Sequence, residues 1–363
     1  MFYGLGHQQA GGLLHRSLYG DSSGQTVPAA AEDLRDLIGI DRLLAAQGDM
    51  AFPLVLLDGD AQQHALYLPG DACHILQLLA GIVGRGHCLL TGVPGLAKTL
   101  LVSSIAEIAD LDFKRVQFTP DMMPGDITGS EILEVDKAGG ERVFKFVKGP
   151  IFTQLLLADE INRTTPKTQA ALLEGMQERC VTVAGVRHRL PDPFFVLATQ
   201  NPIEQEGTYP LPEAQLDRFM FGLEVGYPSY EDELKIMLNT TAGSAAPLEK
   251  VLSAEELLAF QKVVEYIPLP DSVVRFAARI VRATRPGEEG CAPVAEKYIR
   301  WGAGPRAGQC LAHSGKVFAA FEGRLNVADE DILKALEPVM RHRIILNYRA
   351  EADRRTIHDI LAE

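Results

Sequence analysis

The chain has 363 residues, of which 47% are hydrophobic and 23% charged, which is typical of a globular protein with a sizeable core and room for two domains. Its formal net charge of −13 disfavours a protein that grips duplex DNA over a broad surface, because that affinity comes mainly from lysine and arginine on phosphates. The sequence has no run of about 18 apolar residues for a membrane span and lacks the charged and apolar regions of a secretory signal at its start, so we expect a cytoplasmic protein.

The first part of the chain carries weak structural signals. Residues 1–30 are rich in Gly, Ala, Ser, Gln and His and have little apolar periodicity, which predicts a flexible segment. Apolar residues at helical spacing over 31–44 predict a short amphipathic helix. Two apolar runs, 52–57 and 65–68, flank a turn-like stretch and predict a hairpin, and a helix over 71–82 follows.

A phosphate-binding loop is predicted where an apolar, strand-like run ends at Gly92. A Gly/Pro-rich turn follows, and an amphipathic helix continues over 100–108. Such a loop binds phosphate because its N–H groups and the first helical turn point at one spot, where the helix dipole favours an anion. Lys98 adds a positive charge for the β- and γ-phosphates, and the Thr99 hydroxyl can ligate Mg²⁺. The alternative is a tight connection without a ligand, since Ala97 stands where the motif usually has its second glycine.

Two adjacent carboxylates form the second predicted site. Residues 113–118 alternate as a half-buried strand, and an exposed loop is expected over 119–129. The apolar run 155–158 then leads into Asp159 and Glu160, as in a buried parallel strand that ends at the ligand-binding edge of its sheet. We expect Asp159 to hold the metal or its water and Glu160 to orient and deprotonate the attacking water. The alternative is a strand that ends in solvated acids.

Polar residues also follow the next core strand. A helix over 166–178 and a hairpin over 181–190 precede a buried strand over 194–199. Asn201 comes just after this strand, where it can sense a γ-phosphate or position water, although asparagine also caps turns before proline. Arg218 ends a helix-like segment, and a lone arginine of this kind is usually a surface charge.

After residue 227 the composition turns helical and predicts a second domain. Apolar residues recur at helical spacing over 230–238, 254–266, 271–284, 307–322 and 328–339. Within this domain, Arg306 stands at the start of a helix.

Taken in order, these motifs resemble those of the MoxR-type AAA+ ATPases. The matching segments are Gly92-Val93-Pro94-Gly95-Leu96-Ala97-Lys98-Thr99, Ala158-Asp159-Glu160-Ile161-Asn162-Arg163, Ala198-Thr199-Gln200-Asn201-Pro202, Leu216-Asp217-Arg218-Phe219 and Gly304-Pro305-Arg306-Ala307. The stretch over 341–348 also resembles the family's C-terminal signature, so the resemblance covers residues 68–362. Ala97 is what this family commonly carries.

The resemblance implies a fold and a domain order. The fold is α/β, an AAA+ P-loop core with a parallel sheet flanked by helices, followed by a C-terminal all-α lid domain. We expect an N-terminal extension over residues 1–60, the ATPase core over 61–226 and the helical lid over 227–363. Residues 1–60 have no counterpart in the motif set, and a disordered tail, a ring-packing element and a docking site for a client remain open.

The resemblance also implies a role for each matching residue. Cofactor binding falls to Gly92, Val93, Pro94, Gly95, Leu96, Ala97, Lys98, Thr99 and Asp159, with Thr99 and Asp159 as the Mg²⁺ ligands. The catalytic set is Glu160 in Walker B, Asn201 as sensor 1, Arg218 as the arginine finger and Arg306 as sensor 2. The family usually has a V-G-Q-like segment near the adenine, and this chain has residues 68–71 there instead, which leaves the adenine contacts open.

The implied function is ATP hydrolysis in a homo-oligomeric ring, usually a hexamer, because an arginine finger completes the site of its neighbour. Members of the family act as chaperones that assemble or activate metalloenzymes and other complexes, often with a partner that carries a von Willebrand factor A domain. A loop inserted at residues 122–132 and beyond, together with the hairpin over 181–190, would face the pore or the protein client.

Two other functions remain open at this point. A DNA-acting AAA+ motor is favoured by Arg187, His188 and Arg189 on the hairpin and disfavoured by the acidic net charge. An ATP-gated structural scaffold would bind ATP and assemble with little turnover, which the presence of Glu160 and Arg218 disfavours. DNA-stimulated ATPase activity would identify the first, and assembly with negligible turnover the second.

Overall fold

The computed structural model describes residues 53–55, 65–67, 72–92, 98–135, 142–202, 207–230, 233–234, 237–238 and 250–363. The predicted helix over 31–44 lies outside these residues, as does the N-terminal extension apart from 53–55. The turn over 93–97 and the segment over 68–71 also lie outside them, so the roles given to those residues stay predictions. Within the described part of the chain, no helix combines the length and apolar character that crossing a membrane requires.

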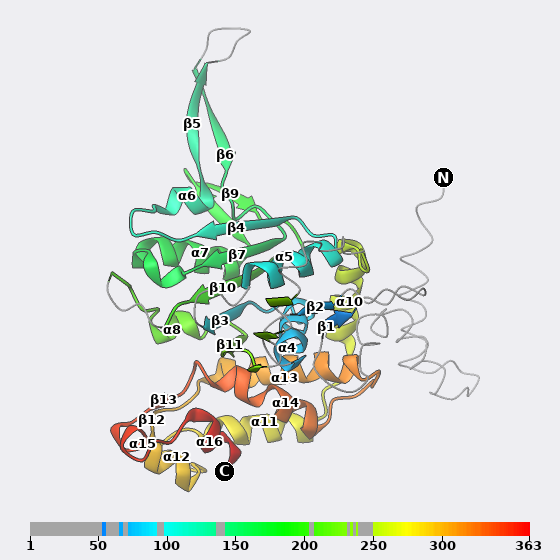
Figure 1. The fold of residues 1–363 in the computed structure, drawn as a ribbon, viewed down its shortest axis with the longest axis vertical. Helices are drawn as coiled ribbons and strands as arrows, with labels where there is room; N and C mark the ends of the chain where they lie inside the picture. The colour runs from blue at the N-terminus through cyan, green and yellow to red at the C-terminus, as the bar shows by residue number, and fades with distance from the viewer. Residues whose placement is uncertain are drawn as a thin grey trace, which may run out of the picture.

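A parallel sheet of five strands forms the centre of the molecule (Figure 1). In chain order the strands are β3 (Cys88–Gly92), β4 (Phe113–Gln117), β7 (Leu155–Asp159), β10 (Phe195–Gln200) and β11 (Phe221–Val225). Their order in space is β11-β3-β10-β7-β4. The apolar runs of β7 and β10 are buried on both faces, as expected for interior parallel strands. The predicted α/β sheet is therefore confirmed, with β11 as an additional edge strand.

All five strands run in the same direction, so their carboxyl ends meet at one edge of the sheet. In the strand register, Gln117 is opposite Asp159, and Gln200 is opposite Thr91. We call this the carboxyl edge, and the opposite one the amino edge. Ligands of open α/β sheets bind at the carboxyl edge.

Helices pack on both faces of this sheet. The helices of the core are α4 (Ala72–Val83), α5 (Lys98–Ile108), α6 (Pro124–Thr128), α7 (Pro166–Glu178), α8 (Glu213–Leu216) and the 3-10 turn η1 (Ile161–Arg163). α4 and α5 share an apolar cluster with Leu155 and Leu157, whereas α7 shares a second cluster with Leu156. Successive residues of a strand point to opposite faces, so the two clusters lie on opposite sides of the sheet.

The segment over 119–129 corrects a prediction, because it is not a loop throughout. It contains α6, and Gly129 already begins a strand. Pro124 occupies the first helical turn, and the Asp126 carboxylate accepts a hydrogen bond of 2.8 Å from the Met123 N–H. Proline and an acidic acceptor in these positions favour the start of a helix. A helix of five residues is too short to show apolar periodicity, so the sequence pattern does not indicate it.

In the described part of the chain, three hairpins accompany the sheet. They are β1 (Pro53–Val55) with β2 (Ala65–Tyr67), β5 (Gly129–Val135) with β6 (Arg142–Lys148), and β8 (Cys180–Val183) with β9 (Val186–Arg189). The first and third are predicted by the sequence, and the third turns at Ala184 and Gly185, both with positive φ, as two-residue hairpin turns require. The β5–β6 hairpin projects away from the body of the molecule (Figure 1).

Over residues 250–363, the C-terminal lid consists of helices and one pair of short strands. Its elements are α10 (Ala254–Tyr266), α11 (Asp271–Ala283), α12 (Pro293–Tyr298), β12 (Ile299–Trp301), α13 (Pro305–Phe321), α14 (Asp329–Met340), β13 (Ile345–Leu346), α15 (Tyr348–Ala352) and α16 (Ile357–Ala362). Four predicted helices are confirmed, and the fifth, over 230–238, lies partly outside the described residues. The antiparallel β12–β13 pair is a departure from the predicted all-α lid.

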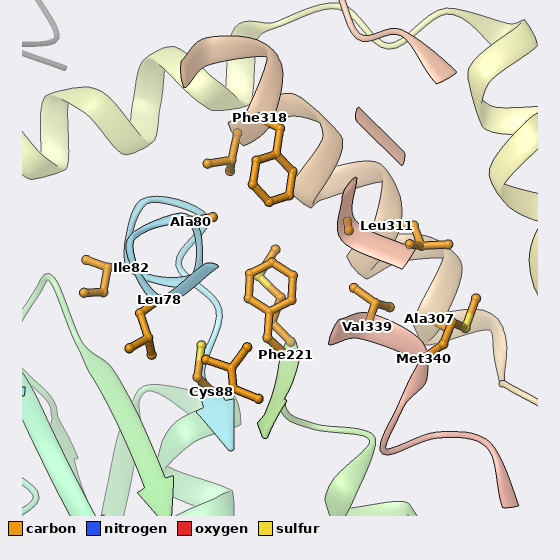
Figure 2. Packing of buried hydrophobic residues seen from close by; sticks show 14 of the residues in the cluster. Leu78, Ala80, Ile82, Cys88, Phe221, Ala307, Leu311, Phe318, Val339 and Met340 are labelled. Carbon is orange, nitrogen blue, oxygen red and sulfur yellow. The ribbon is translucent and has the colours of Figure 1, made fainter. Parts of the chain in front are cut away.

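The lid packs directly on the sheet. Phe221 of β11 lies among Leu311 and Phe318 of α13 and Val339 of α14, in one cluster that also includes Leu78 of α4 (Figure 2). Burying each such side chain contributes about 1.5–3 kcal/mol relative to leaving it in water. Core and lid of the same chain therefore share one continuous apolar core.

Candidate functional site

The carboxyl end of β3 leads to Lys98. This lysine begins α5, and its Nζ donates a hydrogen bond of 2.5 Å to the Gly92 carbonyl at the end of β3. Burial lowers the pKa of Lys98, while the nearby carboxylates of Asp159 and Glu160 oppose that shift. Thr99 follows in the first turn of the same helix. An ammonium group withdrawn from water at a helix N-terminus favours a bound anion.

Both carboxylate oxygens of Asp159 have partners. Oδ1 accepts a hydrogen bond of 2.6 Å from the Thr199 hydroxyl, on the neighbouring strand β10. Oδ2 accepts from the Arg115 guanidinium, at 2.7 Å from Nη2 and 3.1 Å from Nε. Arg115 lies on β4, the neighbour of β7 on its other side. The carboxylate that is predicted to hold Mg²⁺ is therefore oriented by side chains from both adjacent strands.

Glu160 has a left-handed backbone, with φ 57° and ψ 49°. Its N–H donates a hydrogen bond of 2.9 Å to the Thr199 hydroxyl, which anchors this conformation. Its Oε2 accepts a hydrogen bond of 2.9 Å from Gln117 Nε2 and lies 2.9 Å from Arg163 Nε. Such backbone angles cost energy for a residue other than glycine and gather at functional sites. The side chain of the predicted base is thus held by two core residues, Gln117 and Arg163.

Asn201 lies between these groups. It directly follows β10, which is flanked in the sheet by β3 and β7. The residue is buried, and its carbonyl accepts a hydrogen bond of 3.4 Å from Asn162 Nδ2. The structure therefore brings Lys98, Asp159 and Asn201 to one edge of the sheet, and their chemical roles stay predictions.

The residues at this edge fit a nucleotide with Mg²⁺. Mg²⁺ prefers hard oxygen donors and is usually held by one or two carboxylates together with phosphate oxygens. Asp159 offers a carboxylate and Thr99 a hydroxyl, and Lys98 carries the charge that phosphates require. Among the described residues no three His, Cys, Asp or Glu side chains gather to hold a metal by themselves. This donor set suits an ion shared with phosphates better than one held in a protein cage.

Arg218 and Arg306 lie at the amino edge instead. Both line a cavity of about 330 Å³ between core and lid, together with Arg85, Arg179 and His313. We call this cavity the arginine pocket. All residues that line the pocket belong to the described part of the chain, and none of them carries a carboxylate. The residues just before β3 and β11 also line it, and a strand of five residues such as β3 spans about 13 Å. Arg218 and Arg306 are therefore remote from Lys98 of the same chain.

The charges of the pocket are only partly neutralised. Arg218 donates a hydrogen bond of 3.0 Å to the Leu173 carbonyl, and Arg306 lies 3.6 Å from the Asp217 carboxylate. Arg85 and Arg179 share the Asp192 carboxylate, at 3.3 and 3.4 Å. Burial lowers the pKa of Arg179, the positive charge of Arg85 lowers it further, and Asp192 opposes both. A concentration of positive charge in an acidic protein favours an anionic ligand.

Several residues in contact with the predicted site are absent from the sequence prediction. They are Arg115, Gln117, Arg163, Thr199 and Arg343. Arg163 and Thr199 lie inside the matching segments, and the alternation over 113–118 places Arg115 and Gln117 on one side of a strand, so these four carried a usable signal. Arg343 lies in the closing stretch, and only the fold connects it to Asp217.

Two of the three basic residues of the β8–β9 hairpin, Arg187 and His188, have partners within the chain. Arg187 Nε donates to Cys180 Sγ at 2.8 Å, and Arg187 Nη2 lies 3.9 Å from the Glu178 carboxylate. The His188 ring stacks on Phe146 of β6, with centroids 3.9 Å apart and planes inclined by 20°. This stacked pair joins the two hairpins that the resemblance places near a pore or a client.

Comparison with known families assigns both parts of the chain. Residues 87–221 match the ATPase family associated with various cellular activities, AAA, and residues 291–363 match an AAA lid domain. The core and lid of the fold thus correspond to two modules found together in AAA+ proteins.

Similar proteins cover most of the chain. Chaperone MoxR1 of Mycobacterium tuberculosis is 42% identical over 278 residues, which is 76% of this chain and 72% of the relative. Protein MoxR of Paracoccus denitrificans is 31% identical, over 83% of this chain and 91% of its own length. A crystal structure of a candidate ATPase from Cytophaga hutchinsonii, 39% identical, superimposes with a TM-score of 0.76 and covers 92% of this chain and 94% of that one. The chain therefore belongs to the MoxR family of AAA+ ATPases.

Proposed function

We propose that copies of this chain form a ring, six-membered as is usual in the family, and hydrolyse ATP there to remodel or activate client proteins. The observation that supports the proposal is the separation of two half-sites. Lys98, Asp159 and Glu160 lie at the carboxyl edge, and Arg218 and Arg306 line the arginine pocket at the amino edge. Because β3 lies between them, one copy cannot bring both halves to one nucleotide. In a ring, the amino edge of each copy would face the carboxyl edge of the next.

The carboxyl half would bind the nucleotide and start the reaction. Lys98 and the N–H groups at the start of α5 would hold the β- and γ-phosphates of ATP. Thr99 and Asp159 would hold Mg²⁺, which neutralises charge on the phosphates when bound. Glu160 would accept a proton from the water that attacks the γ-phosphate, after its carboxylate leaves Gln117 and Arg163. Asn201 would orient that water or contact the γ-phosphate.

The amino half would act on the nucleotide of the neighbouring copy. Arg218 would stabilise the charge that spreads over the γ-phosphate oxygens in the transition state, an effect worth about 10³–10⁵ in rate in other phosphoryl-transfer enzymes. Arg306 would contact the same phosphates from the lid. Both residues would then act in trans, and isolated copies would be nearly inactive.

The β5–β6 hairpin is the proposed contact for the client. Leu133 and Phe144 are opposite each other in its register and are 50% and 69% exposed, so the hairpin presents apolar side chains beyond the body of the molecule. Exposed apolar surface of this kind suits the binding of an unfolded or partly assembled protein. The chaperone name of the mycobacterial relative agrees with this use. We also propose a von Willebrand factor A domain protein as a partner.

The two rival functions have less support. Of the three basic side chains that favour a DNA-acting motor, Arg187 and His188 are engaged within the chain, and Arg189 is exposed. An ATP-gated scaffold needs no catalytic base, yet Glu160 is held at the carboxyl edge by specific hydrogen bonds.

A mixing experiment tests the shared site. Lys98→Ala copies keep the arginine pocket but lose the lysine of the carboxyl half. Arg218→Ala copies keep the carboxyl half but lose an arginine of the pocket. Each variant alone should lose at least about 10³ of the ATPase rate, consistent with an arginine that acts in trans. Coexpressed in one ring, the two variants should recover activity at the junctions where intact halves meet. Arg275→Ala, an exposed arginine of α11, is the matched control and should retain the rate of the unmodified chain.

Two outcomes would contradict the proposal. If mixed rings stay as inactive as either variant, Lys98 and Arg218 do not serve the same site from different copies. If the unmodified chain is fully active at concentrations where light scattering shows only monomers, no neighbouring copy is needed. DNA-dependent turnover would instead favour the DNA-acting motor, and nucleotide-dependent assembly without turnover would favour the scaffold.

A further inference from the structure

Arg343 is a buried arginine whose contacts reach from the lid into the core. It lies just beyond α14, and its side chain is only 2% exposed. Its Nε donates a hydrogen bond of 2.7 Å to Asp217 Oδ1, and its Nη2 donates to the main-chain carbonyls of Asp217 at 3.1 Å and Phe219 at 2.6 Å. Its Nη1 donates to the Met220 carbonyl at 3.3 Å and to the Val339 carbonyl, within its own domain, at 2.5 Å.

This arrangement satisfies a group that is costly to bury. A buried guanidinium destabilises the fold unless its charge is paired and its N–H groups are hydrogen-bonded. Arg343 meets both conditions almost entirely with one short segment, residues 217–220, which joins α8 to β11. Lysine could not reproduce it, because an ammonium group has three donors on a flexible stem instead of five in a planar fork.

The segment that Arg343 binds contains Arg218. The carbonyls that accept from Arg343 belong to Asp217, Phe219 and Met220, on both sides of Arg218 in the chain. Fixing these carbonyls sets the course of the main chain through Arg218 and therefore the direction in which its side chain leaves. The Arg218 guanidinium itself donates a hydrogen bond of 3.0 Å to the Leu173 carbonyl.

Asp217 extends the same connection to the second arginine. One of its carboxylate oxygens accepts from Arg343 at 2.7 Å, and the other lies 3.6 Å from Arg306 Nη1. Arg343 is 2% exposed and Arg306 41% exposed in the side chain, so the first arginine is an internal anchor and the second is free to meet a ligand in the pocket. A single buried residue thus orients both Arg218, through the main chain, and Arg306, through Asp217.

We infer that Arg343 is a positioning residue, which holds Arg218 and Arg306 side by side for the nucleotide of the neighbouring copy. The inference rests on the proposed function, since it assigns a supporting residue to the amino half of that shared site. Arg343 touches no substrate and acts through Asp217 and the 217–220 segment. Because the lid that carries Arg343 also shares an apolar core with β11 (Figure 2), core and lid of one copy present the two arginines as one preformed unit.

Arg343→Met tests the inference, because methionine keeps an unbranched apolar stem and removes every donor. We expect kcat to fall about 100-fold, as misplacement of catalytic groups by about 1 Å can do, with the KM for ATP within about twofold of its original value. The matched control is Arg341→Met. Arg341 also joins lid to core, through an ion pair with Glu224 of β11, and it pairs with Glu337 inside the lid, so its ion pairs in the described part of the chain are with other segments than 217–220. Its kcat should stay within about twofold.

Mixed rings separate positioning from a general structural role. Arg343→Met copies coexpressed with Lys98→Ala copies should regain activity, because the first retain an intact carboxyl half and the second an intact amino half. Arg343→Met coexpressed with Arg218→Ala should regain none, because both lack the amino half. A variant that is merely unstable would be rescued by neither partner. Rescue by Arg218→Ala, or an unchanged kcat for Arg343→Met, would overturn the inference.

Further variants keep the test decisive if Arg343→Met does not fold. Asp217→Asn preserves the size of the bridging side chain and removes its charge, and it should show the same pattern of rescue. Arg343→Lys should fall between Arg343→Met and the unmodified chain in kcat. If Lys98→Ala and Arg218→Ala complement each other but Asp217→Asn and Lys98→Ala do not, the positioning role is wrong and the shared site stands. If no pair complements, the shared site itself is wrong.

Discussion

The two edges of the sheet hold their charged residues in different ways. At the carboxyl edge, Asp159 and Glu160 are matched by Arg115, Gln117 and Arg163, all from the core. At the amino edge, the arginine pocket is lined by four arginines and no carboxylate, and its parts come from both core and lid. The acids of one edge are thus satisfied within the chain, whereas the charges of the arginines at the other edge are only partly neutralised, by Asp192, Asp217 and Glu265.

This difference indicates which half of the site needs something from outside. A surplus of guanidinium groups in a protein of net charge −13 is stabilised when an anion enters the cavity. Carboxylates that already have donors must exchange them before they can act. One copy therefore contains a restrained carboxyl half and a receptive amino half, which is the arrangement expected of an enzyme completed by its neighbour.

The largest effect should follow from removing the predicted base. Glu160→Gln keeps the shape of the side chain but cannot accept a proton, so turnover should fall about 10²–10⁴-fold, the usual contribution of a general base. ATP affinity, measured with a fluorescent nucleotide, should persist because Lys98 and Asp159 are unchanged. In mixed rings the variant should be rescued by Arg218→Ala, which retains the carboxyl half. Normal turnover in rings made only of Glu160→Gln copies would show that Glu160 is not the base. The carboxyl edge would then not hold a restrained catalytic group.

Most of the fold could be predicted because its signals are local. The helix expected over 254–266 coincides with α10, where apolar periodicity begins at a capping box formed by Ser253 and Glu256. The β5–β6 hairpin could not be predicted in this way. Its apolar residues, such as Leu133 and Phe144, are exposed, so no buried face imposes an alternating pattern on the sequence.

The candidate site divides along the same line. Lys98, Asp159 and Glu160 could be proposed because a phosphate loop and a strand that ends in acids are contiguous motifs. Arg115 binds a carboxylate 44 positions away, and Arg343 binds one 126 positions away. No periodicity or motif connects residues at such separations, and the contacts become visible only when the strands and the lid are packed together.

The arginine pocket should bind an anion even when Lys98 is removed from the carboxyl half. In Lys98→Ala, tripolyphosphate at about ten times its Kd should stabilise the fold by about 1.4 kcal/mol and raise the Tm by about 2 °C for a chain of this length. Replacing Arg218 and Arg306 by alanine in the same background should abolish the shift. Sodium chloride at equal ionic strength controls for screening. An equal shift in the absence of both arginines would show that the pocket is not the receptive half.

Restraint of the base can be tested at Gln117. Its Nε2 donates to Glu160 Oε2 at 2.9 Å, and such a bond contributes about 1 kcal/mol. Gln117→Ala should release Glu160 toward the nucleotide and raise basal turnover about fivefold, which is the same energy expressed as a rate. Lys114→Ala is the control on the same strand, since side chains alternate between faces along a strand and residues three apart therefore lie on opposite faces. Lower turnover in Gln117→Ala would mean that the bond supports catalysis instead of restraining it.

The smallest expected effect concerns His87, which directly precedes β3. Val196 N–H donates to Nδ1 at 3.0 Å, so Nε2 carries the proton and donates to the Met176 carbonyl at 3.1 Å. Burial lowers the pKa of His87 to about 4, the Met176 bond opposes this, and the charge of Arg179 lowers it further. Protonation of Nδ1 would break the bond from Val196.

The sign of the pH dependence follows from this lowered pKa. At pH 8 His87 is neutral in both the folded and the unfolded chain. As the pH falls through 6.5, His87 takes up a proton in the unfolded chain but stays neutral in the folded chain. The free energy of unfolding therefore decreases, by about 0.8 kcal/mol at pH 6. In urea unfolding, the free energy of unfolding of His87→Gln should not show this decrease of about 0.8 kcal/mol between pH 8 and pH 6. His358→Gln, at an exposed position, should still show it. Identical pH dependence in His87→Gln and the unmodified chain would mean that the ring is not held neutral. A charged ring there would add to the positive charge of the arginine pocket, which His87 also lines.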